Sequence, residues 1–287
     1  MVYTLLNNLY YLKNNGLNHG FIYFNTEKIV EISEKPSPEY ELSELIIDYE
    51  HRALALHGFS IAIDVFKYVF RENYSEEKLS TLSSVELEKI ASNVLYELYM
   101  NGITLPVIYG HRVDIVEKVV KENNIETVFI HSGELREYSG LKYILLKNNR
   151  LIYRERDLGE YGKIVCNSSF VTKDCVFLDT THMFSQNTSL ILYDIMKNNG
   201  LNLDQSLIYL FKPYIVLGID NGDLNKNSRP DIIVHDFRNS LKTTSFKTMK
   251  NVLLKTYTPD QVFVKGELFF DRGESLVLQQ YRVVDLF

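Results

Sequence analysis

The apolar and polar residues follow β-type patterns at the two ends of the chain. Runs rich in Leu, Ile, Tyr and Phe occupy residues 3–12 and 20–32, with a turn-prone Asn-Asn-Gly at positions 14–16 between them. A second β-type region covers residues 231–237 and 261–273. Strands at opposite ends of a chain can bury their apolar faces against each other. We therefore predict a small β-sandwich domain that joins residues 1–52 to residues 220–287.

The middle of the chain alternates helical and strand patterns. Ser83 and Glu86 have the spacing of a capping box, and apolar residues then recur at helical intervals up to Asn101 and Gly102. Further helices are predicted at residues 113–121, 188–198 and 204–211. Strands are predicted at 103–109, 125–131, 143–146, 151–154, 163–166 and 175–178. This alternation favours a mostly parallel sheet or barrel over residues 53–219.

That middle segment is too short for a complete eight-stranded barrel, which takes about 200 to 250 residues. Helical patterns are missing between positions 133 and 162, so we place a deletion in this span. The predicted fold class is α/β, with a reduced or incomplete TIM-like (β/α) barrel beside the small β-sandwich domain.

Composition and charge narrow the classes of function. Of the 287 residues, 45% are hydrophobic and 24% are charged, and the formal net charge is −6. This charge argues against broad binding to nucleic acid or to anionic membranes. The first thirty residues lack a signal-peptide pattern, and no apolar run approaches the length of a transmembrane helix. Two cysteines, Cys166 and Cys175, make no disulfide framework, so we expect a cytoplasmic protein with two small buried thiols.

Residues 47–65 read IDYEHRALALHGFSIAIDV. Asp48 stands in an extended segment, an apolar strand follows, and Gly58 and Phe59 end that strand. This order resembles the start of the barrel in the amidohydrolase superfamily. There, an Asp, a short apolar strand and Pro-Gly-Phe precede a His-x-His pair that binds the metal.

Four other segments resemble the same family in the same order along the chain: residues 20–34, 95–104, 211–236 and 262–273. Within the third of these, Arg-Pro-Asp-Ile-Ile-Val-His-Asp at 229–236 is similar to the family's Ala-Asp-Leu-Val-Val-x-Asp. The branch that contains cytosine deaminases and chlorohydrolases is the most similar one. The resemblance implies a metal-dependent barrel that hydrolyses C–N or C–halogen bonds of heterocycles or amides.

The metal ligands of that family are mostly missing from this sequence. Such a metal lowers the pKa of its bound water to about 7, which requires several fixed His, Asp or carboxylated Lys ligands. His57 replaces the proline, and Ile63 and Val65 occupy the positions of the His-x-His pair. Residues 141–176 contain no His for the middle strands, and only the Asp of the last strand is retained, as Asp179.

Asp179 is the candidate catalytic residue, as a general base at the end of a barrel strand. The alternative is a turn or N-cap Asp that has lost its chemistry. The candidate pocket residues lie at or just beyond the predicted carboxyl ends of strands: Asp64, Tyr109, His111, His131, Asp179 and His182. Their spacing has no metal-ligand signature, so a ligand pocket is favoured over a rebuilt site for zinc or another divalent metal. His57 is expected to be a hydrogen-bonded core residue.

Three hypotheses about function remain open. The leading one is a protein that has lost its metal centre and has a non-catalytic binding, scaffolding or regulatory role with no cofactor. The alternative is a metal-dependent hydrolase that acts on C–N bonds of cyclic amides or aminated heterocycles through a rearranged site. The third is a metal-free protein that binds a small molecule. The apolar strands at 262–270 and 276–287 are expected to be buried in the chain's own small sheet, and the alternative is that their edges bind a second copy in a homodimer or a protein partner.

Overall fold

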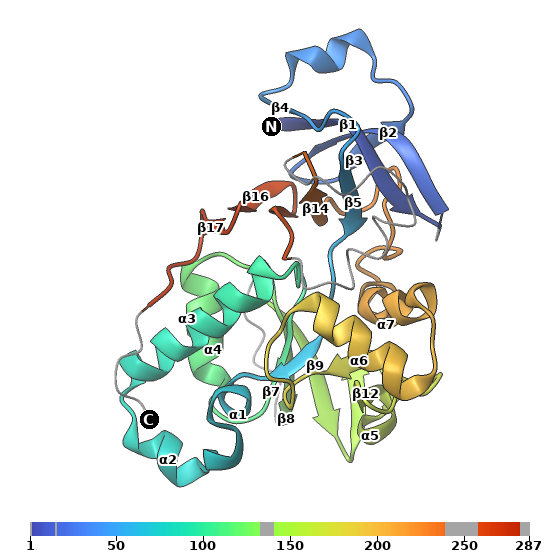
Figure 1. Ribbon diagram of the computed structural model, residues 1–287. Coiled ribbons are helices and arrows are strands. Elements are labelled where there is room, and N and C mark those ends of the chain that lie inside the picture. The colour runs from blue at the N-terminus through green and yellow to red at the C-terminus, as the bar shows by residue number, and fades with distance from the viewer. Residues whose placement is uncertain (1, 15, 133–140, 239–257, 282–287) are drawn as a thin grey trace.

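The computed structural model describes residues 2–14, 16–132, 141–238 and 258–281. Its strands form two sheets, with the helices gathered around the second sheet (Figure 1). Position 15 of the predicted turn, residues 133–140 of the predicted deletion and residues 282–287 of the predicted strand edge lie outside the described residues. Within the described ranges, no helix is long and apolar enough to span a membrane.

Strands from both ends of the chain meet in the first sheet. Its nine described strands are β1 (Tyr3–Lys13), β2 (Gly16–Asn25), β3 (Ile29–Ser33), β4 (Leu45–Asp48), β5 (Ala53–His57), β14 (Ile232–Asp236), β15 (Gln261–Val264), β16 (Glu267–Asp271) and β17 (Glu274–Ser275). They follow the order β17-β16-β15-β14-β5-β1-β2-β3, and β4 pairs with β1. The pairing of the two ends agrees with the sequence pattern, but a sandwich of two sheets is not confirmed. The division of the chain into domains stays a prediction.

Strand β5 connects the two groups of terminal strands. It runs parallel to β1 and antiparallel to β14, so it lies in the middle of the nine-stranded sheet. The sequence analysis assigned these residues to the barrel segment. Their burial on both faces explains why β5 reads as a fully apolar strand without alternation.

The second sheet is a curled half-barrel. Its described strands are β6 (Ala62–Asp64), β7 (Val107–Tyr109), β8 (Val128–Ser132), β9 (Lys142–Lys147), β10 (Arg150–Tyr153), β11 (Arg156–Glu160), β12 (Val165–Asn167) and β13 (Phe177–Asp179). The order is β11-β10-β9-β8-β7-β6-β13-β12, and the strands from β9 to β12 in this order are parallel. Antiparallel β10 and β11 extend one edge, where the sequence lacked helical patterns. The predicted incomplete barrel is therefore confirmed as a mixed α/β half-barrel.

The helices are α1 (Val65–Phe70), α2 (Glu76–Thr81), α3 (Ser84–Met100), α4 (Val113–Glu122), α5 (Tyr161–Ile164), α6 (Thr188–Asn199) and α7 (Leu203–Val216). Short 3₁₀ turns occupy η1 (Pro38–Leu42) and η2 (Arg71–Asn73). In the view of Figure 1, α3 and α4 lie to the left of the half-barrel, α6 overlaps its strands, and α7 lies to the right. The predicted capping box of Ser83 and Glu86 is present at the start of α3.

Two helix predictions differ from the structure. The first half of the predicted strand at 163–166 is the helical turn α5, because its short apolar run has no period that distinguishes helix from strand. Helix α7 continues past Pro213 to Val216, whereas the predicted helix ended at residue 211.

The C-terminal segment packs partly on α3. Leu278 is buried in the main core, the Ser92 hydroxyl donates to the carbonyl of Gln279 at 3.1 Å, and Asn93 exchanges hydrogen bonds with the backbone of Tyr281. These contacts cover part of the apolar segment 276–287, which the sequence analysis considered as a possible surface for a partner.

Residues 58–61, which we call the crossing segment, carry the chain from β5 in the nine-stranded sheet to β6 in the half-barrel. The backbone N–H groups of residues 58, 59 and 60 each donate at 2.9 Å to a carbonyl of another part of the chain, in Asp231, Gly102 and Leu210. The Ser60 hydroxyl donates to the carbonyl of Leu105 at 2.6 Å. All four residues are buried, so these bonds satisfy groups that have no access to water.

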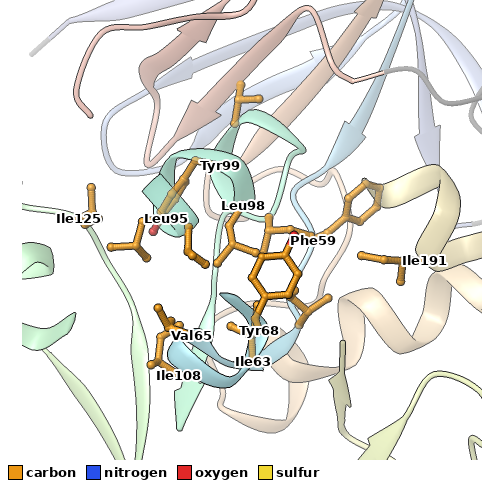
Figure 2. Packing of buried hydrophobic residues seen from close by; sticks show 14 of the residues in the cluster. Phe59, Ile63, Val65, Tyr68, Leu95, Leu98, Tyr99, Ile108, Ile125 and Ile191 are labelled. Atoms are coloured by element: carbon orange, nitrogen blue, oxygen red, sulfur yellow. The ribbon is translucent and has the colours of Figure 1, made fainter. Parts of the chain in front are cut away.

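Apolar side chains surround the crossing segment. Figure 2 shows the cluster that Phe59, Ile63 and Val65 share with α3, α6 and β7 through Leu95, Leu98, Ile191 and Ile108. His57, just before the segment, is a buried and hydrogen-bonded residue, as predicted. Its Nε2 lies 3.0 Å from Asp220 Oδ2, and its Nδ1 lies 2.8 Å from the carbonyl of Gly58. Burial lowers the pKa of His57, but the hydrogen bond and charge of Asp220 outweigh burial and raise it overall.

We predict that Gly58→Ala destabilises the protein by about 1–3 kcal/mol. A Cβ atom at this position would lie 1.9 Å from Thr104 Oγ1, and that hydroxyl is held at 2.5 Å by Tyr214. The matched control is Gly162→Ala, where a Cβ meets nothing within 4 Å. Urea unfolding followed by circular dichroism measures both variants. Equal unfolding midpoints for the two variants would contradict the tight packing of Gly58 against Thr104.

Candidate functional site

A cavity of about 710 Å³ lies at the carboxyl ends of three parallel strands of the half-barrel. Tyr109 ends β7, Asn167 ends β12 and Asp179 ends β13, and all three line the cavity. Asn167 is in register with Asp179, so the ends of β12 and β13 stand at one level, and Tyr109 on β7 lies two residues further along. In barrel folds this end of the strands carries the active site.

The opposite wall of the cavity comes from α1 and η2. Lys67 and Arg71 line it together with Phe184. The Arg71 guanidinium lies 4.4 Å from the centre of the Phe184 ring and donates to the carbonyls of Met183 and Phe184 at 3.3 and 3.1 Å. These contacts hold the exposed Phe184 ring at the rim. The sequence analysis missed this wall, because the approach of α1 to the loop after β13 is not encoded in local spacing.

Asp179 fits both roles that the sequence left open. One carboxylate oxygen accepts the backbone N–H of Thr181 at 2.9 Å, as in a turn, and the side chain also lines the cavity. Burial and the charge of Asp179 raise the pKa of Tyr109 far above its ordinary value. The Tyr109 hydroxyl therefore stays protonated beside Asp179, 3.2 Å from Thr181 Oγ1.

Asp64 lies at the end of β6, in register with Tyr109, but behind the cavity wall. It is the N-cap of α1, where one carboxylate oxygen accepts the N–H of Lys67 at 3.0 Å. Gly110 covers the carboxyl group so closely that a Cβ there would lie 2.2 Å from Asp64 Oδ2. Burial raises the pKa of Asp64, and the hydrogen bond from Lys67 opposes this effect.

His182 belongs to a directed hydrogen-bond chain at the cavity edge. Its Nδ1 lies 3.2 Å from Asn167 Nδ2, an amide group that can only donate, so Nδ1 accepts and carries no proton. Nε2 must then carry the proton in neutral His182, and it donates to Ser168 Oγ at 3.2 Å. The Ser168 hydroxyl donates to Asp194 Oδ2 at 2.5 Å. Ser168 is therefore a positioning group for His182 and not an activated nucleophile.

The other two candidates lie outside the cavity lining. His111 is exposed and lies 3.0 Å from Glu76. His131 is on β8, and its buried Nδ1 has no hydrogen-bond partner among the described residues. The cavity thus combines Tyr109, Asp179 and His182 with Asn167 and Thr181, which the sequence analysis had not named. Asn167 directly follows the strand predicted at 163–166. The same criterion that selected the other candidates, a position at or just beyond the carboxyl end of a strand, would therefore have identified it.

The metal centre that the family resemblance implies has no matching set of ligands among the described residues. The sequence resemblance assigns Ile63 and Val65 to the positions of the ligating His pair, and both are buried in the apolar core of Figure 2. Within the described ranges, no group of three or more His, Cys, Asp or Glu side chains could hold a metal ion. One carboxylate beside a tyrosine and a threonine instead makes a site for hydrogen bonding and proton transfer.

We predict that His182 populates the tautomer with the proton on Nε2. The ¹⁵N chemical shifts of the ring, measured by NMR, report the tautomer directly. Ser168→Ala removes the acceptor and should reduce this preference. A wild-type ring with its proton on Nδ1 would contradict the hydrogen-bond chain.

Comparison with known proteins gives a match at the level of structure. No family model and no curated protein matches the sequence. Atrazine chlorohydrolase from Arthrobacter aurescens TC1, solved with zinc, has a TM-score of 0.72 at 10% identity, with 96% of this chain and 97% of that chain covered. E. coli guanine deaminase has a TM-score of 0.70 at 11% identity, with 95% and 100% covered.

An adenosine deaminase from Xanthomonas campestris, solved with bound zinc, has a TM-score of 0.73 at 10% identity, with 96% of this chain and 94% of that chain covered. The three proteins are members of the amidohydrolase superfamily. Their similarity covers nearly the whole of each chain and includes the half-barrel that forms the cavity. The chain therefore has the fold of the amidohydrolase superfamily, as the resemblance in its sequence predicted.

Proposed function

We propose that the carboxyl-end cavity binds a small amide or aminated heterocycle and that the protein hydrolyses a C–N bond of this ligand. The observation that carries the proposal is the position of Asp179, at the end of a parallel strand and in the wall of the cavity beside a protonated Tyr109. The structural neighbours, which are a chlorohydrolase and two deaminases, support the same class of reaction.

The chemistry of the cavity suits such a ligand. A volume of about 710 Å³ is in the range of small-molecule sites. The Asp179 carboxylate can accept N–H groups of an amide or amine, and the Tyr109 hydroxyl can donate to a ring nitrogen or a carbonyl oxygen. Phe184 supplies an aromatic surface at the rim for a flat ring.

Hydrolysis in this arrangement requires the transfer of one proton from water to Asp179 and then to the departing nitrogen. Asp179 takes a proton from water as the water oxygen attacks the ligand carbon, and Tyr109 donates a hydrogen bond to the negative charge that develops. The C–N bond then breaks, and the departing nitrogen takes up the proton from Asp179.

A non-catalytic binding role is the second candidate, and a specific observation favours it. The positions that the sequence resemblance assigns to the metal-binding His pair hold Ile63 in β6 and Val65 at the start of α1, and both side chains are buried in the core. A cavity without that pair can retain affinity for a ligand of the same shape while turnover is lost.

We predict that Asp179→Asn lowers kcat/KM by at least about 100-fold. Guanine and adenosine serve as the first aminated heterocycles, and dihydrouracil serves as a cyclic amide. Ammonia release measures deamination, absorbance measures ring opening, and isothermal titration calorimetry measures binding. Glu76→Gln is the control, because it removes an exposed carboxylate outside the cavity and should leave the rate within about twofold.

The outcomes separate the two candidates. Turnover that depends on Asp179 supports the hydrolase. Binding that depends on Asp179 without turnover in the wild type assigns the non-catalytic role. Turnover that survives in Asp179→Asn rules out this site as the catalytic centre.

A further inference from the structure

A second cavity, of about 480 Å³, lies at the amino ends of the parallel strands, opposite the carboxyl-end cavity. Glu126 precedes β8 and Lys142 begins β9, so one wall belongs to the half-barrel. Arg229 precedes β14 and Lys265 lies in the turn between β15 and β16, so the other wall belongs to the nine-stranded sheet. The cavity is thus at the seam between the two sheets.

Positive charge dominates the lining of this cavity. Four cationic side chains face two carboxylates there: Lys142, Arg154, Arg229 and Lys265 against Glu27 and Glu126. Glu126 is 3% exposed and is shared by three of the cations. It forms an ion pair with Lys142, with Arg229 at 2.9 Å and with Lys265 at 2.5 Å. Asp231, behind Arg229, adds a second buried carboxylate, so Glu126, Asp231 and Glu27 face four cationic side chains and one positive charge is left in excess when Lys142 is protonated.

Arg229 has hydrogen-bonding capacity that no described residue uses. Its side chain is only 10% exposed, and its Nε and Nη1 lie 2.8 and 2.9 Å from carboxylate oxygens of Asp231 and Glu126. The buried Nε and Nη2 form no hydrogen bond that meets the geometric criteria among the described residues, nor do the two carboxylate oxygens of Glu126, and Arg229 lines the cavity. A buried guanidinium donor without an acceptor is costly, and an anion in the cavity would supply the acceptor.

Arg154 has no role in joining the two sheets. It lies in the turn between β10 and β11, is exposed, lines the cavity and forms no ion pair within the described part of the chain. A cluster that served only to hold the sheets together would not need this fourth cation.

We propose that the amino-end cavity binds the phosphate group of a small phosphorylated molecule. A phosphate dianion brings two charges and several acceptor oxygens, which matches a guanidinium with an unused donor and lysines that repel one another. The cavity is larger than a phosphate ion, so the ligand is a phosphate ester whose remaining part fills the space. This site is independent of the carboxyl-end cavity and of the reaction proposed there.

The protonation of Lys142 agrees with this proposal. Burial lowers the pKa of Lys142 to about 8, and the positive charges of Arg229, Lys265 and Arg154 add to the effect, while Asp231 opposes it. Glu126 also faces the ammonium group. At pH 8 about half of the Lys142 side chains are neutral in the free protein. A bound phosphate raises this pKa, so binding takes up protons.

The test is isothermal titration of the full-length protein with inorganic phosphate and with glycerol 3-phosphate. We expect Arg154→Gln to raise the Kd of both at least about tenfold. The matched control, Arg156→Gln, removes an exposed cation two positions away that does not line the cavity, and it should leave Kd unchanged. Titrations at pH 8 in buffers of different ionisation enthalpy should reveal proton uptake, and Lys142→Met should abolish that uptake.

Three results would overturn the proposal. The first is no binding of either phosphate compound at millimolar concentration. The second is equal weakening by Arg154→Gln and Arg156→Gln, which would indicate general charge attraction. The third is tighter binding of citrate than of glycerol 3-phosphate with the same dependence on Arg154, which would assign the cavity to polycarboxylates.

Discussion

Both cavities depend on the four buried residues that carry the chain from one sheet to the other. The crossing segment donates three consecutive backbone N–H groups to three different parts of the chain, and leaving one such buried donor unpaired costs about 1–3 kcal/mol. The last residue of the crossing segment, Ile61, determines where β6 begins. The register of β6 with β7 and β13 then determines how far Asp64, Tyr109 and Asp179 lie along the strands at the carboxyl end. The start of the segment bonds the carbonyl of Asp231, the residue that pairs with Arg229 at the amino end.

The backbone of this protein is similar to that of known hydrolases, but the side chains at its carboxyl-end site suggest a different chemistry. The backbone matches zinc-containing hydrolase and deaminase structures over nearly its whole length, yet Ile63 of β6 and Val65, the first residue of α1, are buried in the core. At the end of β6, Asp64 is the N-cap of α1. The chemistry that remains belongs to β7, β12, β13 and the loop after β13. Asp179 is central to the proposed function because it is the carboxylate in that set.

The sequence predicts those features that arise from local patterns. The capping box of α3, the mostly parallel half-barrel and the strand-end positions of Tyr109 and Asp179 follow from patterns along the chain. Three features cannot be predicted from such patterns: the place of β5 in the nine-stranded sheet, the close approach of Gly110 to Asp64, and the contact of Arg71 with the loop after β13. Each of these features depends on contacts between segments that are distant in the sequence. Hydrophobic periodicity within a local window does not predict such contacts.

The central proposal is that Asp179 and its hydrogen-bonding neighbours act in this amidohydrolase fold without a resident metal. Elemental analysis of the untagged protein, dialysed against zinc, iron and manganese and then against buffer, tests it most directly. The account predicts well below one metal ion per chain, because Ile63 and Val65 replace the ligands. About one tightly held ion per chain, lost in Asp179→Asn, would contradict it.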